Sequence, residues 1–193
     1  MPPPNLSAAT LTAREVGSDY AGNLLTDGDR FLGQVTLDLC NATFPSEGLR
    51  TGRRQETYTR TAPELWVSNE VVTYVPGGAA QALGEVNTVA RQCAGKPVTR
   101  QYSTDAVTTT ITPLTVPGLL PGSVAVEINV LDKRGATVTH QETVFAVYQS
   151  SGTTLSAVYV HAIGPTAIAS GRTLAARLAL LCRTHLQAQA LVA

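Results

Sequence analysis

The chain has 193 residues, of which 44% are hydrophobic and 15% charged, a composition typical of globular and not of disordered proteins. A chain of this length is expected to fold as one domain that buries roughly 70% of the surface exposed in its unfolded form. Its 14 basic residues balance 14 acidic ones, so no basic surface is predicted for nucleic acid. No apolar run reaches about 18 residues, the length that a membrane-spanning helix needs.

The first third of the chain is predicted to be rich in loops. Residues 1–10, "MPPPNLSAAT", form a Pro-rich polar lead that we expect to be a disordered linker remnant, followed by one domain over residues 11–193. A helical turn capped by Thr12 is expected at 11–17. Glycine, aspartate and proline interrupt residues 18–54, where only 31–40 has the pattern of a regular element.

Helices and strands are clearer in the rest of the chain. Apolar residues recur at helical spacing over 76–95, with Cys93 on the apolar side, and again over 173–191, with Cys182 on that side. Strands are predicted at 55–61, 65–75, 98–103, 106–116, 123–132, 136–150 and 154–163, the first two as a hairpin or ribbon and the last three as an antiparallel meander.

The expected fold class is α+β. Valine and isoleucine alternate with Glu127 and Asn129 in the segment 123–132, which predicts a sheet with one dry face and one wet face. We therefore expect a single domain in which two main amphipathic helices pack on an antiparallel β-sheet of about 5–7 strands.

The sequence contains no catalytic or metal-binding signature. The motifs G-x-S-x-G, G-x-G-x-x-G, G-x-x-x-x-G-K-[ST] and C-x-x-C are absent, and His140, His161 and His185 lack ligand spacing. We expect no enzymatic activity, no cofactor and no metal. A glycosylation sequon at 41–43 is expected to mark only a surface turn, and residues 76–83 are expected to form a plain helix entrance in preference to an anion site.

One segment, residues 53–74, combines arginines with aromatic residues at strand spacing. Such a segment can line a groove in which aromatic rings give contact area and arginines orient the acidic groups of an anionic or sugar-like ligand. The predicted ligand-binding residues are Arg53, Arg54, Tyr58, Trp66, Glu70 and Tyr74. The alternative is that Trp66, the only tryptophan, fills the core while the charges decorate an exposed ribbon.

The three cysteines allow three single pairings, each leaving one thiol, and residue patterns alone do not choose among them. A small buried hydrophobic residue is the simplest role for Cys40 in a cytosolic chain. A redox or nucleophilic role would need a nearby base, and the sequence around Cys40 supplies none.

Two stretches carry a resemblance to a known family. They are "LDLCNATFPSEGLRTGRRQETYTR" (37–60) and "VSNEVVTYVPGGAAQALGEV" (67–86), followed by a cysteine at the predicted helix end. Together they resemble actinobacterial envelope proteins, secreted or lipid-anchored, that are grouped with the extracellular sensor domain of PknH-type serine/threonine kinases. The resemblance extends over residues 10–193.

This resemblance implies an exported sensor-like domain with an antiparallel sheet, helices and a central cleft suspected of ligand binding. It also implies a disulfide between Cys40 and Cys93, with Cys182 reduced. The kinase sensor domain is thought to hold two disulfides, whereas three cysteines can form only one.

The expected function is therefore a non-catalytic, extracellular sensor-type domain of the bacterial cell envelope. It would bind a small molecule or a cell-wall fragment in the cleft as a monomer, and would reach a membrane only through a removed signal or lipid-anchor segment. The alternative is a protein-interaction or structural envelope lipoprotein domain without a small-molecule ligand. A concave pocket lined by Trp66, Tyr58 and arginines would favour the first function, and a flat apolar patch the second.

Overall fold

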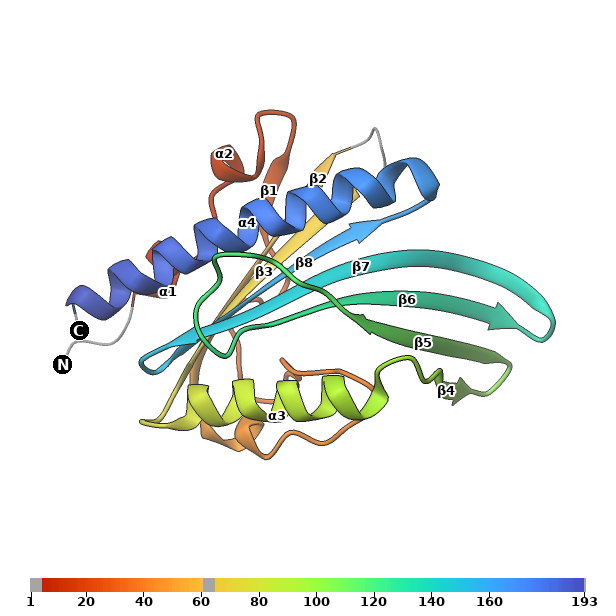
Figure 1. The fold of residues 1–193 in the computed structure, drawn as a ribbon, viewed down its shortest axis with the longest axis horizontal. Helices are drawn as coiled ribbons and strands as arrows, with labels where there is room; N and C mark the ends of the chain where they lie inside the picture. The colour runs from red at the N-terminus through yellow and green to blue at the C-terminus, as the bar shows by residue number, and fades with distance from the viewer. Residues whose placement is uncertain (1–4, 61–64, 193) are drawn as a thin grey trace.

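The computed structural model describes residues 5–60 and 65–192, which form one α+β domain. The strands are β1 (Ala21–Leu24), β2 (Arg50–Arg60), β3 (Leu65–Tyr74), β4 (Val98–Tyr102), β5 (Asp105–Pro113), β6 (Val124–Arg134), β7 (Thr137–Ser151) and β8 (Thr154–Ala162). They form one antiparallel sheet in the order β1-β2-β3-β8-β7-β6-β5-β4 (Figure 1). The predicted α+β class is confirmed. The eighth strand, β1, was not predicted because its sequence, AGNL, is short and exposed at the sheet edge.

Two long helices accompany the sheet, α3 (Gly78–Cys93) and α4 (Pro165–Val192). The predicted helix at 76–95 is confirmed, with the expected apolar side buried. The helix predicted at 173–191 begins earlier, at Pro165, a residue type that suits the first turn of a helix. None of the described helices is both long and apolar enough to cross a membrane.

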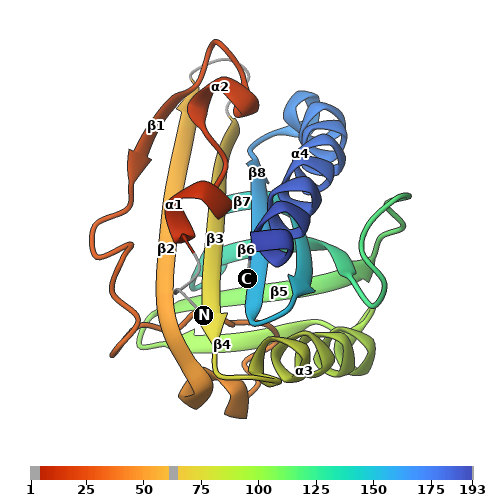
Figure 2. The same ribbon diagram turned by 90° about the vertical axis from the view of Figure 1, so that its left-hand side faces the viewer.

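The two long helices cover opposite faces of the sheet (Figure 2). On β8, Leu155 and Ala157 belong to the core under α3, while Val158 and Val160 belong to the core under α4. Successive strand residues point to opposite faces, so the central strands are buried on both sides. The expectation of one dry and one wet face is therefore wrong for the centre of the sheet.

The folded part of the chain begins at an earlier residue than the sequence predicts. The sequence predicts a disordered lead over residues 1–10, yet Leu6–Ala9 form a helical turn, α1, and the side chain of Ala9 is buried. The buried amide of Asn69 anchors the chain here, because its Oδ1 accepts from Leu11 N at 2.8 Å and its Nδ2 donates to Ala157 O at 3.0 Å. Residues 1–4 of the predicted lead lie outside the described part of the chain.

The predicted capped turn at 11–17 is confirmed as α2 (Ala13–Val16). The Thr12 hydroxyl accepts from Glu15 N, and the Glu15 carboxylate accepts from Thr12 N at 2.7 Å, which together form a capping box. Arg177 on α4 fixes the end of α2, because its guanidinium donates to the backbone carbonyls of Glu15 and Val16.

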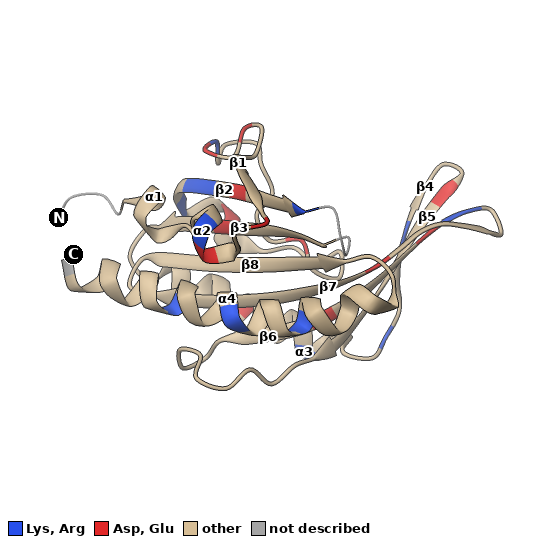
Figure 3. Cartoon of the chain, turned by 90° about the horizontal axis from the view of Figure 1, so that it is seen from above, with Lys and Arg blue, Asp and Glu red and all other residues tan. Residues whose placement is uncertain are grey.

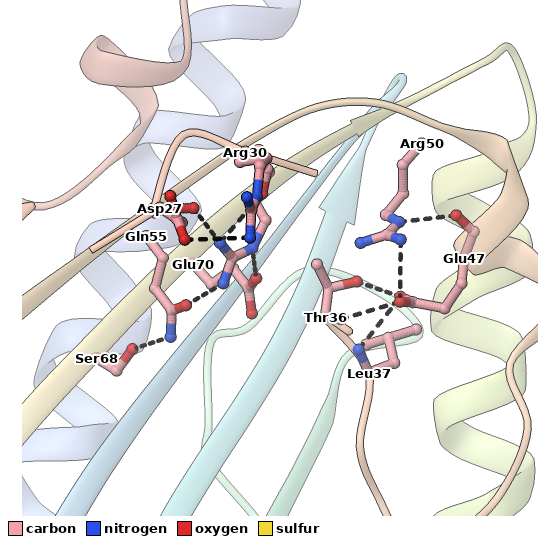
Figure 4. A network of polar contacts seen from close by, with 10 residues as sticks. Asp27, Arg30, Thr36, Leu37, Glu47, Arg50, Gln55, Ser68 and Glu70 are labelled. Carbon is pink, nitrogen blue, oxygen red and sulfur yellow. Dashed lines mark hydrogen bonds and ion pairs between the residues drawn. The ribbon is translucent and has the colours of Figure 1, made fainter. Parts of the chain in front are cut away.

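Residues 31–40 cross the face of the sheet under α3 as an irregular segment and do not form the regular element allowed by their pattern. The carboxylate of Glu47, in the 3-10 helix η1 (Pro45–Leu49), accepts from Thr36 N at 3.0 Å and Leu37 N at 3.2 Å (Figure 4). A disulfide joins Cys40 to Cys93 at the end of α3, with the Cα atoms 6.6 Å apart. The pairing implied by the family resemblance is confirmed, and Cys182 is a buried free thiol, as expected.

Breaking the Cys40–Cys93 bond should lower the free energy of unfolding by about 4 kcal/mol, because the bond closes a loop of 53 residues in the unfolded chain. We expect urea denaturation to show similar losses in the free energy of unfolding for Cys40→Ser, Cys93→Ser and the double variant. The unfolded, unreduced protein should titrate one thiol. Three thiols, or variants that unfold at the wild-type urea concentration, would show that the bond does not form.

Candidate functional site

The six residues predicted to bind a ligand lie on two faces of the sheet. Residues two apart on a strand share a face, and the β2–β3 register sets Arg53 beside Val72 and Arg54 beside Val71. The face under α3 therefore receives Arg53, Trp66, Glu70 and Tyr74, and the face under α4 receives Arg54 and Tyr58. The six side chains cannot line a single groove.

Three of the six hold the fold together. The Tyr58 side chain is fully buried, and its hydroxyl donates to Leu11 O and to Glu56 Oε2. Arg54 Nε donates to Glu56 Oε1 at 2.8 Å on the same face. Tyr74 is buried in the core around α3. These three side chains serve packing and internal hydrogen bonding.

Arg53 and Glu70 form a buried ion pair beneath the surface of the α3 face. Arg53 also donates through Nη1 to Asp27 O at 3.1 Å and through Nη2 to the Gln55 side chain, so its donors are engaged within the protein. Figure 4 shows Gln55 and Glu70 within this network. Burial raises the pKa of Glu70 to about 7, and the charge of Arg53 opposes part of that rise.

A concave pocket of about 270 Å³ lies over this network, and we call it the Trp66 pocket. Its floor comes from β2, β3 and β8, and its wall from the irregular segment held by Glu47. The lining residues are Val35, Thr36, Asp38, Gln55, Trp66, Ser68, Glu70, Tyr159 and His161. Trp66 and Glu70 are therefore the two members of the predicted set that line one pocket.

The Trp66 ring stacks on the imidazole of His161, with ring centroids 3.4 Å apart and an interplanar angle of 15°. His161 is held in turn by Glu142, whose Oε2 lies 3.1 Å from Nδ1. Burial acts to raise the pKa of Glu142, but the hydrogen bond and charge of His161 outweigh it, and the pKa is lowered. The Glu142 carboxylate thus stays ionised and fixes the ring on which Trp66 rests.

Sequence reasoning missed His161, Tyr159 and Asp38. His161 and Tyr159 reach the pocket only because β8 pairs with β3, placing His161 beside Trp66 and Tyr159 beside Ser68. Asp38 comes from the irregular segment, and on its outer side it pairs with Arg100 at 3.4 Å. No local pattern in the sequence marks these residues as neighbours of Trp66.

The lining of the Trp66 pocket favours neutral, hydrogen-bonding ligands. None of the nine lining residues is Lys or Arg, and the nearest arginine of the predicted set, Arg53, is already paired with Glu70. Within residues 5–60 and 65–192, no group of three His, Cys, Asp or Glu side chains could hold a metal ion. An aromatic ring beside amide, hydroxyl and carboxylate groups can bind a polar organic molecule.

Comparisons with known proteins support the fold. No family model matches the sequence, and no curated protein does. Among solved structures, the extracellular domain of PknH from Mycobacterium tuberculosis is similar, with a TM-score of 0.55 and 17% identity over 93% of this chain and 95% of that one. An uncharacterized protein from Mycobacterium smegmatis has a TM-score of 0.44 and 9% identity over 94% of this chain and 98% of that one. The first similarity shows that this chain has a PknH-like fold, which agrees with the resemblance seen in the sequence.

The buried pair predicts a pH dependence of stability. In the folded protein the Glu70 carboxylate takes up a proton as the pH falls below about 7, so its ion pair with Arg53 is complete only above that pH, whereas in the unfolded chain Glu70 takes up its proton only near the usual 4.5. The contribution of Glu70 to stability is therefore full below about pH 4.5 and is lost as the pH rises through about 7, a loss of roughly 3 kcal/mol. Glu70→Gln should remove that slope in urea denaturation series.

Glu142→Gln is the matched control for this experiment, because the pKa of Glu142 is shifted in the opposite direction. Its contribution is present above the usual carboxyl pKa and is lost as the pH falls. The two variants should therefore change the pH profile with opposite signs. Parallel profiles for wild type and Glu70→Gln would contradict the assignment.

Proposed function

We propose that this chain is a non-catalytic ligand-binding domain of sensor type that works outside the cytoplasm, in the bacterial cell envelope. Its ligand is a small, uncharged polyhydroxyl compound, such as a cell-wall sugar, bound in the Trp66 pocket. The observation that carries this proposal is the Trp66–His161 stack in a polar pocket whose lining contains no arginine or lysine.

Two observations support a place outside the cytoplasm. The Cys40–Cys93 disulfide is of a kind that persists in oxidising compartments and is rare in the cytosol. The fold is similar to that of the extracellular domain of PknH, which agrees with a place outside the cytoplasm. The same similarity supports a sensor role, since sensing outside the membrane needs a folded domain that binds without turnover.

The exposed chemistry of the pocket supports a sugar-like ligand. Gln55 and Tyr159 are half-buried and offer an amide and a hydroxyl, while the exposed Asp38 carboxylate accepts hydrogen bonds from hydroxyl groups. Burial raises the pKa of Tyr159 well above 10, so its hydroxyl stays neutral and can donate. A volume of about 270 Å³ is below the range of roughly 300–1,000 Å³ for drug-sized ligands, which favours a single ring over an oligomer.

The structure changes the chemistry expected for the ligand. The sequence of residues 53–74 is compatible with an anionic or a sugar-like ligand, with arginines orienting acidic groups. Arg53 is paired with Glu70, and Arg54 is paired with Glu56 on the face of the sheet under α4. The sugar-like ligand is therefore the one this pocket favours.

A second candidate function is favoured by one feature. Four of the nine large exposed hydrophobic side chains in the described ranges lie between residues 24 and 35: Leu24, Leu25, Leu32 and Val35. Exposed apolar side chains gathered in one segment are typical of a protein-binding surface. This segment favours the protein-interaction alternative, in which the domain binds a partner and no small molecule.

Replacing Trp66 tests the sugar proposal. Isothermal titration with N-acetylglucosamine and with neutral pentose and hexose monosaccharides should find at least one that binds wild type. Trp66→Ala should weaken that binding about tenfold or more, because the ring supplies the main apolar contact. Trp66→Phe, which keeps a ring, should retain part of it.

Tyr102→Ala is the matched control, because Tyr102 is an exposed aromatic residue on β4 that does not line the Trp66 pocket. It should bind like wild type. Folded Trp66→Ala protein that binds with unchanged affinity would contradict the site, and failure of every sugar to bind wild type would contradict the ligand class.

A further inference from the structure

A second hollow lies on the opposite face of the sheet, between α4 and the turn after α2. Its volume is about 690 Å³, and it is lined by residues of 16–20, by the facing ends of β2 and β3, and by one side of α4 from 169 to 177. We call it the α4 groove. The α4 groove shares no residue with the Trp66 pocket, and none of its lining residues is among the six that the sequence predicts to bind a ligand.

The charge of the α4 groove is positive. Over Pro165–Val192, helix α4 carries Arg172, Arg177 and Arg183 and no Asp or Glu, so it shows only basic colour in Figure 3. The groove itself holds Arg60 and Arg177 against a single carboxylate, Asp19, which pairs with Arg60 at 2.9 Å. One guanidinium charge is therefore left over in the lining.

Arg177 carries that charge. Its Nη1 donates to Glu15 O at 2.7 Å and its Nη2 to Val16 O at 2.5 Å, both neutral backbone carbonyls, and it forms no ion pair with any described carboxylate. The two bonds hold the exposed guanidinium in one orientation and leave further N–H donors unused. A fixed guanidinium without a carboxylate partner suits an anion.

The groove also offers hydroxyl groups and apolar surface, although the Thr173 hydroxyl already donates to Ala169 O at 3.1 Å. Ser170 and Thr173 are exposed on α4, and their spacing places them on the same side of the helix as Arg177. The Arg60 guanidinium lies 5.2 Å from the centre of the Tyr20 ring, which forms the floor. Burial raises the pKa of Tyr20, and its hydroxyl has no hydrogen-bond partner among the residues described. Leu174 adds an apolar contact.

We propose that the α4 groove binds a small organic monoanion, a carboxylate with an apolar body. The carboxylate accepts from Arg177 and from the Ser170 hydroxyl, and the apolar body lies against Leu174 and the Tyr20 ring. One surplus positive charge matches a monoanion, and the mixed lining distinguishes such a ligand from inorganic phosphate. The α4 groove lies on the face of the sheet opposite the Trp66 pocket. Binding of a monoanion in the groove is therefore independent of whether a sugar binds in the Trp66 pocket.

Octanoate is a suitable probe, compared with octanol and with inorganic phosphate by isothermal titration on the full chain. Wild type should bind octanoate, bind octanol at least about tenfold more weakly, and show no heat with phosphate. Arg177→Gln should weaken octanoate about tenfold, the loss expected for one charge-assisted contact. Arg183→Gln is the matched control, because Arg183 lies on the same helix and donates to a loop carbonyl, Gly118 O, outside the groove.

A second pair of variants tests the proposal if Arg177→Gln, which loses the hydrogen bonds to α2, fails to fold. Thr173→Glu places a carboxylate in the groove without removing the Arg177 contacts and should abolish octanoate binding. Thr184→Glu is its control, since both threonines are exposed on α4 and donate to the carbonyl four residues earlier. Equal effects within a pair, octanol binding as tightly as octanoate, or no octanoate binding by wild type would each overturn the proposal.

Discussion

The covalent bond between Cys40 and Cys93 is the constraint on which the candidate site depends. Residues 31–40 have no strand or helix of their own, so their backbone cannot stay in place through a ladder of hydrogen bonds. The disulfide fixes one end of this segment to α3, and Glu47 holds its centre through Thr36 and Leu37. Because Thr36 and Asp38 line the Trp66 pocket, the wall of that pocket exists only while these contacts hold.

The second constraint is burial of the central strands on both faces. Residues of β3 alternate between the core under α3 and the core under α4, so polar residues of this strand are enclosed wherever they point. Enclosed polar groups need partners, and Glu70 finds Arg53 while Asn69 finds Leu11 and Ala157. The two hollows differ in charge: the lining of the Trp66 pocket on the α3 face has no arginine or lysine, and that of the α4 groove has two arginines and one carboxylate.

Much of the fold could be predicted from the sequence, because the signals for it are local. The periodicity of 76–95 located α3 and its buried side, and seven of the eight strands overlap predicted segments, although β2 begins at Arg50, five residues before the predicted start and within the stretch expected to be loop. The site was only partly predictable. Trp66 and Glu70 were identified from their residue types, but their pocket partner His161 depends on the pairing of β8 with β3. Arg53 looked available for a ligand, whereas burial beside Glu70 makes it structural.

The central claim is that Trp66 contacts a neutral sugar-like ligand. Because the chain has one tryptophan, its indole N–H gives one signal in a ¹⁵N–¹H correlation spectrum, and that signal reports directly on the pocket. Titration with the sugar that binds in calorimetry should move this signal progressively, with saturation at the calorimetric affinity. An indole signal that stays in place while the sugar binds would contradict the account.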